Sequence, residues 1–282
     1  MYNVILENEN GEQIDLMHTE GMICVNIDGA TSATATLNET ENANIDGSII
    51  NSERIDSRPI NLTIRIFDNP GECRTKLYYY APIKKKVKLT LINDVRAVYV
   101  EGQVKSNEGD PFTQKEQMVI TILCPEPYFK QLVAIEEEFS NIIKLLHFPL
   151  EIDEFGVPFG EITDTMQAEV INIGEFDSGM EFVIKALGRV VNPKIIDIET
   201  GEYLRVNYTM KAEERLLIGT INKNKYIKSV YNNEETNLIS CLDLTSTWLI
   251  ARIGANRYTY TADNEANNIE AIVSFQNKFV GI

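Results

Sequence analysis

The sequence contains no long apolar run and has few histidines or tryptophans. A membrane-spanning helix needs about eighteen consecutive apolar residues, and no stretch of the sequence approaches this length. Residues 1–4 lack the basic segment that opens a secretory signal. Only two histidines, His18 and His147, and one tryptophan, Trp248, are present in 282 residues. We therefore expect no membrane helix and no secretory leader, and little of the chemistry that histidine supplies.

The four cysteines, at positions 24, 73, 124 and 241, form no closely spaced pair. Structural zinc sites require such pairs. Free buried thiols in a protein made in a reducing cytoplasm are the simplest interpretation. The sequence therefore predicts no metal site and no cofactor.

Motifs for covalent chemistry are also missing. Nucleophilic catalysis needs a nucleophile beside a base, and neither a G-x-S-x-G elbow nor a G-x-x-x-x-G-K-[ST] loop occurs. A glycosidase uses two carboxylates that lie close together. The candidates for such a pair are Glu151, Asp153 and Glu154, or Glu175 and Asp177. In a chain with 42 acidic residues, such groups arise by chance. The first three also lack the spacing of a calcium loop. We predict that the protein is not an enzyme and has no catalytic residues.

The charge is strongly negative and unevenly placed. The formal net charge is −16, whereas a nucleic-acid binder needs clustered Lys and Arg against the phosphates. Residues 1–53 contain no Lys or Arg, and residues 54–96 contain ten of the 26 basic residues, including Lys84, Lys85 and Lys86. Tight DNA binding is not expected, although DNA could pass along an acidic wall. The asymmetry is either a solvated surface or a pair of complementary patches in a head-to-tail ring.

Alternating apolar and polar residues dominate the first half. The segments 60–66, 86–91, 98–100 and 118–123 follow this period and predict strands of an antiparallel sheet or barrel. One helix is predicted to begin at Asn69-Pro70 and to end before Pro82. Residues 31–53, rich in Thr, Ala, Asn and Asp, predict a long loop or an extended hairpin that turns at Asp46-Gly47.

The second half has a similar character after a proline-containing junction. Residues 131–165 predict this junction, and a second β-rich unit is predicted to begin at 166. Its expected strands cover 168–173, 180–185, 203–208, 215–221, 247–252, 257–261 and 269–275. Their spacing favours a β-sandwich.

Several motifs together resemble the distal tail protein (Dit-like) family of siphovirus-type phage tails. In the first half they are Ile45-Asp46-Gly47-Ser48, Arg58-Pro59-Ile60-Asn61-Leu62, Tyr99-Val100-Glu101-Gly102-Gln103-Val104 and Cys124-Pro125-Glu126-Pro127-Tyr128-Phe129. In the second half they are Asn172-Ile173-Gly174, Asn192-Pro193, Glu199-Thr200-Gly201-Glu202 and Phe279-Val280-Gly281-Ile282. The order and spacing of the motifs carry the resemblance, which covers most of the chain.

This resemblance implies a mainly β fold: an N-terminal split β-barrel with one helix, like that of tail-tube proteins, and a C-terminal galectin-like β-sandwich. Residues 1–130 would form a homo-hexameric ring around the DNA channel, 131–165 the junction, and 166–282 the sandwich. Implied partners are the tail tube protein, the tail-associated spike or lysin protein and a receptor-binding protein. The location would be the virion tail of a phage or prophage, after synthesis in the bacterial cytoplasm. Residues 31–53 would form an arm that reaches a neighbouring subunit or lines the ring.

A tail-tip carbohydrate-binding module is the alternative. Galectin-type sites stack a sugar on a tryptophan, and Trp248 is the only one available. Its neighbours Thr247 and Leu249 resemble a strand that enters a core, and the polar companions of a sugar site are missing. A packing role for Trp248 is the favoured interpretation.

Overall fold

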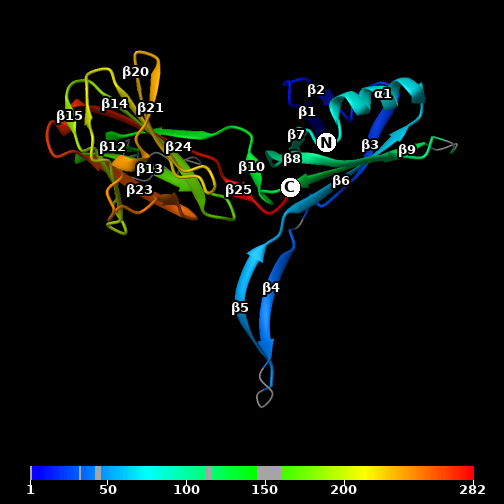
Figure 1. Cartoon of the computed structure of the whole chain (residues 1–282), viewed down its shortest axis with the longest axis horizontal. Coiled ribbons are helices and arrows are strands. Elements are labelled where there is room, and N and C mark those ends of the chain that lie inside the picture. Colours follow the sequence, from blue (N-terminus) through cyan, green and yellow to red (C-terminus); the bar gives the residue numbers. More distant parts are fainter. Residues whose placement is uncertain (1, 32, 42–45, 112, 114–115, 145–159) are drawn as a thin grey trace, which may run out of the picture. The chain divides into compact units, whose positions relative to one another are not determined.

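A computed structural model describes residues 2–31, 33–41, 46–111, 113, 116–144 and 160–282 (Figure 1). The chain divides into two compact units. Unit 1 comprises residues 1–132 and 278–282, and unit 2 comprises residues 133–277. The predicted mainly β architecture is confirmed. No helix within the described residues is long and apolar enough to cross a membrane.

Unit 1 is built on an antiparallel sheet with the strand order β2-β1-β7-β8-β9-β6-β3. The strands are β1 (Asn3–Asn8), β2 (Gln13–Asp15), β3 (Met22–Asp28), β6 (Arg58–Ile66), β7 (Lys86–Ile92), β8 (Ala97–Gly109) and β9 (Gln117–Cys124). The four strands predicted from alternation in this half are present. The described sheet stays open, because its edge strands β2 and β3 do not pair with each other.

The apolar residues of the alternating segments form the core of unit 1. In β6, the side chains of Ile60, Leu62 and Ile64 are fully buried, and the residues between them face outward. The predicted helix is confirmed as α1 (Pro70–Tyr80), which buries Cys73 and Leu77 in the same core. Pro70 lies in the first turn of α1, where its missing N–H costs no hydrogen bond.

The last residues of the chain also belong to unit 1. Strand β25 (Lys278–Phe279) pairs with β10 (Phe129–Gln131), so that Phe279 lies opposite Phe129. Strand β10 in turn pairs with β8. The sequence predicts that the motif at 279–282 belongs to the second domain, whereas the structure places these residues in unit 1, with Phe279 in its sheet. Unit 1 is therefore built from two segments that are far apart in the sequence.

Unit 2 contains two larger sheets. The first sheet has the strand order β11-β24-β14-β19-β20-β21, and β22 also pairs with β14. Its strands are β11 (Ile135–Glu138), β14 (Ser178–Ala186), β19 (Arg215–Gly219), β20 (Tyr226–Tyr231), β21 (Glu234–Asn237), β22 (Ile250–Ala251) and β24 (Ile269–Phe275). The second has the order β12-β13-β23-β16-β17: β12 (Ser140–Lys144), β13 (Gly160–Asn172), β23 (Gly254–Thr261), β16 (Lys194–Asp197), β17 (Tyr203–Arg205).

A single core lies between these two sheets. Phe182 of β14 meets Tyr258 of β23 edge to face, with ring centroids 5.9 Å apart, and both side chains are fully buried. A small sheet pairs β15 (Val190–Val191) with β18 (Thr209–Met210), and two short 3-10 helices are η1 (Ile239–Cys241) and η2 (Ala266–Asn268). Two facing antiparallel sheets around one core form the predicted β-sandwich.

The segment 131–165, expected to be a junction, contains strands. The whole of β11 and β12 and the start of β13 lie within it. Residues 145–159, which include Pro149 and Pro158, lie outside the described residues. Two strands expected at 203–208 and 247–252 are shorter, as β17 and β22.

Candidate functional site: interaction surfaces of unit 1

The segment 31–53, for which a loop or an extended hairpin was predicted, includes most of an exposed hairpin. Strands β4 (Ala35–Glu41) and β5 (Ser48–Ile55) pair with each other and join no other sheet of the described structure, and in Figure 1 they leave the sheet of unit 1 as a separate ribbon. We call this hairpin, residues 35–55, the arm. Its aliphatic residues Leu37, Ile49 and Ile50 are more than half exposed. An isolated two-stranded ribbon is only marginally stable in water, and exposed aliphatic side chains that lie together mark interaction sites.

The two faces of the arm differ in chemistry. Side chains that are directly opposite in register share one face of an antiparallel pair. Leu37 pairs with Glu53, and Glu39 pairs with Ile50 beyond a bulge at Asn38/Glu39. We call this the acidic face. The side chains on this face are those of Ala35, Leu37, Glu39, Glu41, Ser48, Ile50, Glu53 and Ile55.

The other face, which we call the amide face, is largely neutral. Asn38 donates to the Ser52 hydroxyl at 2.8 Å, and the Asn51 amide donates to the Thr40 hydroxyl. Thr36 donates to Asp56 at 2.6 Å. Arg54, opposite Thr36, is the first basic residue of the chain and pairs with Asp56 at 3.3 Å. The polar groups of this face thus bind one another. On the acidic face, the described residues form one such bond, from Ser48 to Glu39.

The root of the arm is held by a buried arginine. Arg58, which is 3% exposed, donates to the carbonyl oxygen of Gly29 at 3.2 Å and to that of Val280. Its guanidinium carbon lies 4.8 Å from the centroid of the Phe129 ring. Burial lowers the pKa of Arg58. A buried cation that binds backbone carbonyls on both sides fixes the two segments that carry them.

A second arginine holds the same terminal segment. Arg96 donates to the carbonyl oxygen of Gly281 at 3.2 Å, and its guanidinium lies 4.3 Å from the centroid of the Phe279 ring. The backbone N–H of Ile282 donates to the carbonyl oxygen of Ala30 at 3.3 Å. A Cβ atom at Gly281 would lie 2.5 Å from the carbonyl oxygen of Thr31, so only glycine allows this close approach. Residues 278–282 therefore pack directly on the root of the arm.

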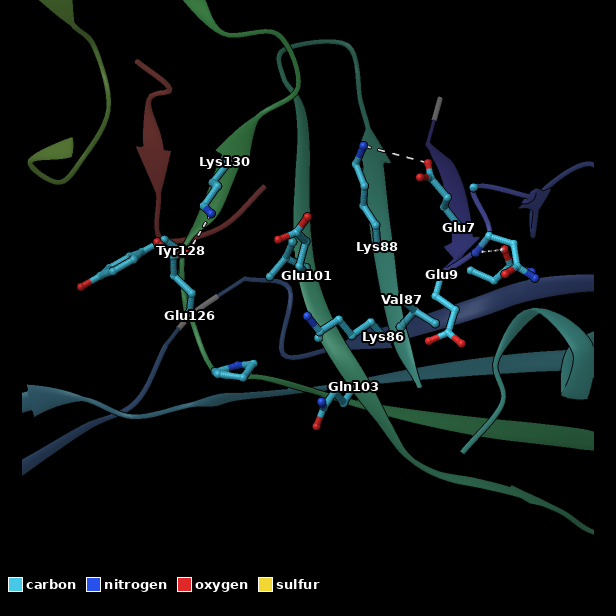
Figure 2. Close-up of a pocket in the computed structure, with 16 residues that line it drawn as sticks. Glu7, Glu9, Lys86, Val87, Lys88, Glu101, Gln103, Glu126, Tyr128 and Lys130 are labelled. Atoms are coloured by element: carbon cyan, nitrogen blue, oxygen red, sulfur yellow. Dashed lines mark hydrogen bonds and ion pairs between the residues drawn. The ribbon is translucent and has the colours of Figure 1, made fainter. Parts of the chain in front are cut away.

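A groove of about 690 Å³ lies over β1, β7, β8 and β10 (Figure 2). Its floor carries opposite charges on adjacent strands, since Lys88 of β7 lies opposite Glu101 of β8. Lys88 is 4.0 Å from Glu7. The lining contains no histidine, cysteine or serine. This alternation of charges suits recognition of a polar surface and offers no nucleophile.

One end of the groove contains a half-buried carboxylate between two lysines. Glu126 lies 2.7 Å from Lys130 and 3.6 Å from Lys278. Burial raises the pKa of Glu126, but hydrogen bonds and the charges of the two lysines outweigh this effect and hold it below its usual range. The motif Cys124–Phe129 of the sequence thereby contributes to the attachment of β25.

A smaller hollow of about 280 Å³ adjoins the groove and shares Asn8, Glu9 and Asn10 with it. Tyr78 and Tyr79 of α1 line this hollow and are each about half exposed. The next exposed residues are Ile83 and three lysines. We call the set Tyr78, Tyr79, Ile83, Lys84, Lys85 and Lys86 the aromatic–lysine surface. It combines apolar area with positive charge.

Of the residues considered for catalysis, His18 and Asp177 are described with their partners. His18 is exposed and lies 2.8 Å from Asp15. Asp177 accepts a hydrogen bond from the backbone N–H of Ile253 at 3.1 Å. His147, together with Glu151, Asp153 and Glu154, lies outside the described residues. Among the described residues, no three His, Cys, Asp or Glu side chains are grouped as metal ligands.

The single tryptophan packs against the core of unit 2. Trp248 is partly buried there, and the Nζ atom of Lys225 lies 5.2 Å from its ring centroid. This position suits the packing role favoured from the sequence better than an open sugar-stacking platform.

The cysteines give a direct test of burial. Cys24, Cys73 and Cys124 are buried and Cys241 is half-buried, and all four are free. Burial raises the pKa of Cys24 to about 11 and that of Cys124 to about 12. Because the thiolate is the reactive species, we expect Cys24 and Cys124 to react roughly a hundredfold or more slower than an ordinary thiol at pH 8. A disulfide reagent should titrate Cys241 first, and all four thiols after denaturation; four equally fast thiols in the folded protein would contradict the burial.

Known proteins share parts of this sequence and this fold. Residues 173–279 match the family of siphovirus-type tail components, C-terminal domain. The SPP1 Dit (gp 19.1) protein has a similar fold, with a TM-score of 0.72 and 11% identity over 99% of both chains. A chain of the phage P2 baseplate, in its activated conformation with calcium, gives a TM-score of 0.58 at 12% identity over all of both chains. No curated protein matches the sequence.

Residues 173–279 thus form a domain of the siphovirus-type tail component family. The fold over nearly the whole chain is that of a Dit protein. The resemblance to distal tail (Dit-like) proteins found in the sequence motifs is confirmed by the domain match and by the similar fold.

Sequence reasoning missed the contribution of the terminal segment to unit 1. Arg58 and Arg96 are separated from residues 278–282 by most of the chain, and no local pattern links them. The composition of residues 31–53 indicated the arm, and the charge asymmetry between residues 1–53 and 54–96 pointed to both the arm and the aromatic–lysine surface.

Proposed function

We propose that the protein is a structural hub of a phage tail, which assembles as a homo-hexameric ring and joins the tail tube to the tail tip. The observation that carries this proposal is the fold: it follows a Dit protein described as a paradigm of the hub adsorption apparatus of phages that infect Gram-positive bacteria, over 99% of both chains. The family match in unit 2 supports the same role. The ring would be located in the virion tail after synthesis in the host cytoplasm.

In this proposal residues 1–130, completed by the terminal segment, form the ring, and the sandwich of unit 2 lies outside the channel. The tail tube protein and the tail-associated spike or lysin protein bind the two ring faces, and receptor-binding proteins bind the periphery. A net charge of −16 supports a channel wall that repels DNA and lets it pass. The role is one of assembly and requires no catalysis.

The mass of the particle in solution tests the ring. A hexamer would have six times the chain mass of 31.9 kDa, about 191 kDa. We expect native mass spectrometry to find this species and negative-stain microscopy to show rings. A protein that stays monomeric at high concentration, both alone and with its tail tube protein, would contradict the hexameric ring.

A further inference from the structure

We propose that the groove over β1, β7, β8 and β10 binds a single extended acidic segment of a partner protein, which is held at one end by a cluster of three lysines. We call Lys84, Lys86 and Lys105 the lysine cluster; it lies beside the start of β7 and on the adjoining strand β8. The inference rests on the proposed hub role, since a hub binds other tail proteins, and it names the chemistry by which unit 1 recognises one of them.

The lysine cluster differs from the other lysines in its lack of partners. Most lysines with described side chains bind a carboxylate or lie over an aromatic ring. Within the described residues, those that do neither are Lys84, Lys86, Lys105 and Lys223. Three of these four lie together, although the chain has a net charge of −16 and many carboxylates that could neutralise them.

The backbone brings the three lysines to one place. Lys86 lies opposite Gln103, and Lys105 is exposed two residues further along β8, with buried Val104 between them. The backbone N–H of Lys84 donates to the carbonyl oxygen of Val104 at 2.8 Å. Like charges on neighbouring strands repel each other. An anionic group bound between these lysines would therefore relieve a repulsion that is present in the free protein.

The lysine cluster adjoins the groove through Lys86. Lys86 and Gln103 line the groove, and Figure 2 shows both side chains there. The smaller hollow beside the groove is lined by Tyr78, Tyr79 and Pro82, among others, and can receive an apolar side chain of the same ligand. The ligand that fits this surface is therefore anionic at one point and apolar close by.

Carboxylates in the groove decide which class of anionic ligand fits. Glu7, Glu9 and Glu101 also line it, and Glu101 lies opposite Lys88. A uniform polyanion such as DNA would meet these carboxylates, and the juxtaposition of like charges is unfavourable. A polypeptide can place acidic side chains at the lysine cluster and neutral or basic ones along the rest of the groove. The pattern of charges therefore favours a protein segment.

The size of the groove favours a single strand over the arm of a second copy. A volume of about 690 Å³ is that of a site for a drug-sized ligand, which corresponds to a few residues of one chain. The arm is a two-stranded ribbon with strands of seven and eight residues. Paired strands lie about 4.8 Å apart before their side chains are counted. We therefore assign the groove to one extended segment of a different protein.

Peptide binding tests this assignment. The probe is a fluorescently labelled octapeptide of alternating glutamate and leucine, and its binding to the full chain is followed by fluorescence anisotropy. The first variant combines Lys84→Gln, Lys86→Gln and Lys105→Gln. The second variant, Gln103→Trp, adds bulk in the groove without a change of charge. Circular dichroism shows that each variant is folded.

The matched control combines Lys211→Gln, Lys223→Gln and Lys225→Gln, which removes three exposed lysines from unit 2 and changes the net charge equally. The lysine-cluster variant and Gln103→Trp are each expected to bind the probe about tenfold more weakly than the unaltered protein, because one loses charge complementarity and the other loses space. The control should bind like the unaltered protein. An equal loss in the control would show a general effect of charge and overturn the assignment.

Other outcomes contradict the assignment in different ways. If folded Gln103→Trp binds the probe like the unaltered protein, the segment does not occupy the groove. If a short DNA duplex binds as tightly as the probe and depends on the lysine cluster, the groove is a polyanion site. If a peptide of residues 35–55 binds more tightly than the probe, the occupant is a second copy of the chain. If the unaltered protein does not bind the probe, this inference fails, while the particle mass still tests the hexameric ring independently.

Discussion

Deletion of residues 278–282 is expected to destabilise unit 1 by about 3–5 kcal/mol, the cost typical of removing a buried phenylalanine. Phe279 is 5% exposed in the core that also contains Phe129. The deletion also removes the Val280 carbonyl, one of the two backbone acceptors of buried Arg58, and the loss of that hydrogen bond adds to the cost. The stability of unit 1 therefore depends on residues that follow the whole of unit 2.

Hydrogen exchange, measured at increasing denaturant concentration, reports this loss of stability in unit 1. Amides of β6 and of residues 29–31 at the arm root should exchange faster in the deleted protein. Trp248, the only tryptophan, lies in unit 2 and provides the internal control, because its fluorescence transition should remain at the same denaturant concentration. Unchanged exchange in unit 1 would show that the terminal segment does not hold the root.

Replacement of Phe182 by alanine should destabilise unit 2 by about 3–5 kcal/mol. Phe182 is fully buried, and its ring meets Tyr258 across the two sheets of the sandwich. Truncation leaves a cavity in the middle of the core and removes an aromatic contact. The Tyr258 hydroxyl donates to the carbonyl oxygen of Ile250 at 2.8 Å, which limits how far that ring can move to fill the cavity.

Trp248 fluorescence follows this transition directly. Leu187→Ala is the matched control, because Leu187 is 46% exposed and its truncation should change the stability of unit 2 by no more than about 0.5 kcal/mol. Hydrogen exchange in β6 and β7 of unit 1 should be unaffected by either change. Equal effects of Phe182→Ala and Leu187→Ala would show that the core does not lie between the sheets as described.

Much of the fold follows from short-range sequence patterns. The period of two in 60–66 predicts β6 because alternate residues must be buried on one face of the sheet. The segment 269–275 matches β24 residue for residue. Helix α1 follows from Asn69-Pro70 and Pro82, which limit it at both ends. Such elements carry their own signal and need no knowledge of distant partners.

Elements defined by distant partners could not be predicted. Strand β25 has two residues, and only its pairing with β10 makes it a strand. The sequence alone places residues 279–282 in the unit that precedes them, because a return of the chain to the first sheet has no local signature. Strands β17 and β22 are short for a related reason: neighbouring strands determine where their hydrogen bonding ends.

The candidate interaction surfaces were only partly visible in the sequence. The absence of Lys and Arg before Arg54 indicates one acidic surface, and Lys84, Lys85 and Lys86 indicate a basic one. The sequence does not show which side chains of the arm share a face, because the bulge at Asn38/Glu39 shifts the register. Only the pairing in the structure separates Glu39, Glu41 and Glu53 from Arg54.

The return of residues 278–282 to the first sheet has a consequence for biosynthesis. Domains generally fold as units during translation, with the N-terminal one first. Unit 1 cannot complete its sheet in that order, because Phe279 is synthesised after every residue of unit 2. Nascent chains released before this point would lack the contacts that residues 278–282 make with the root of the arm. The order of synthesis would thus delay completion of unit 1 until every residue of unit 2 has been made, and prematurely terminated chains would carry an incomplete first sheet.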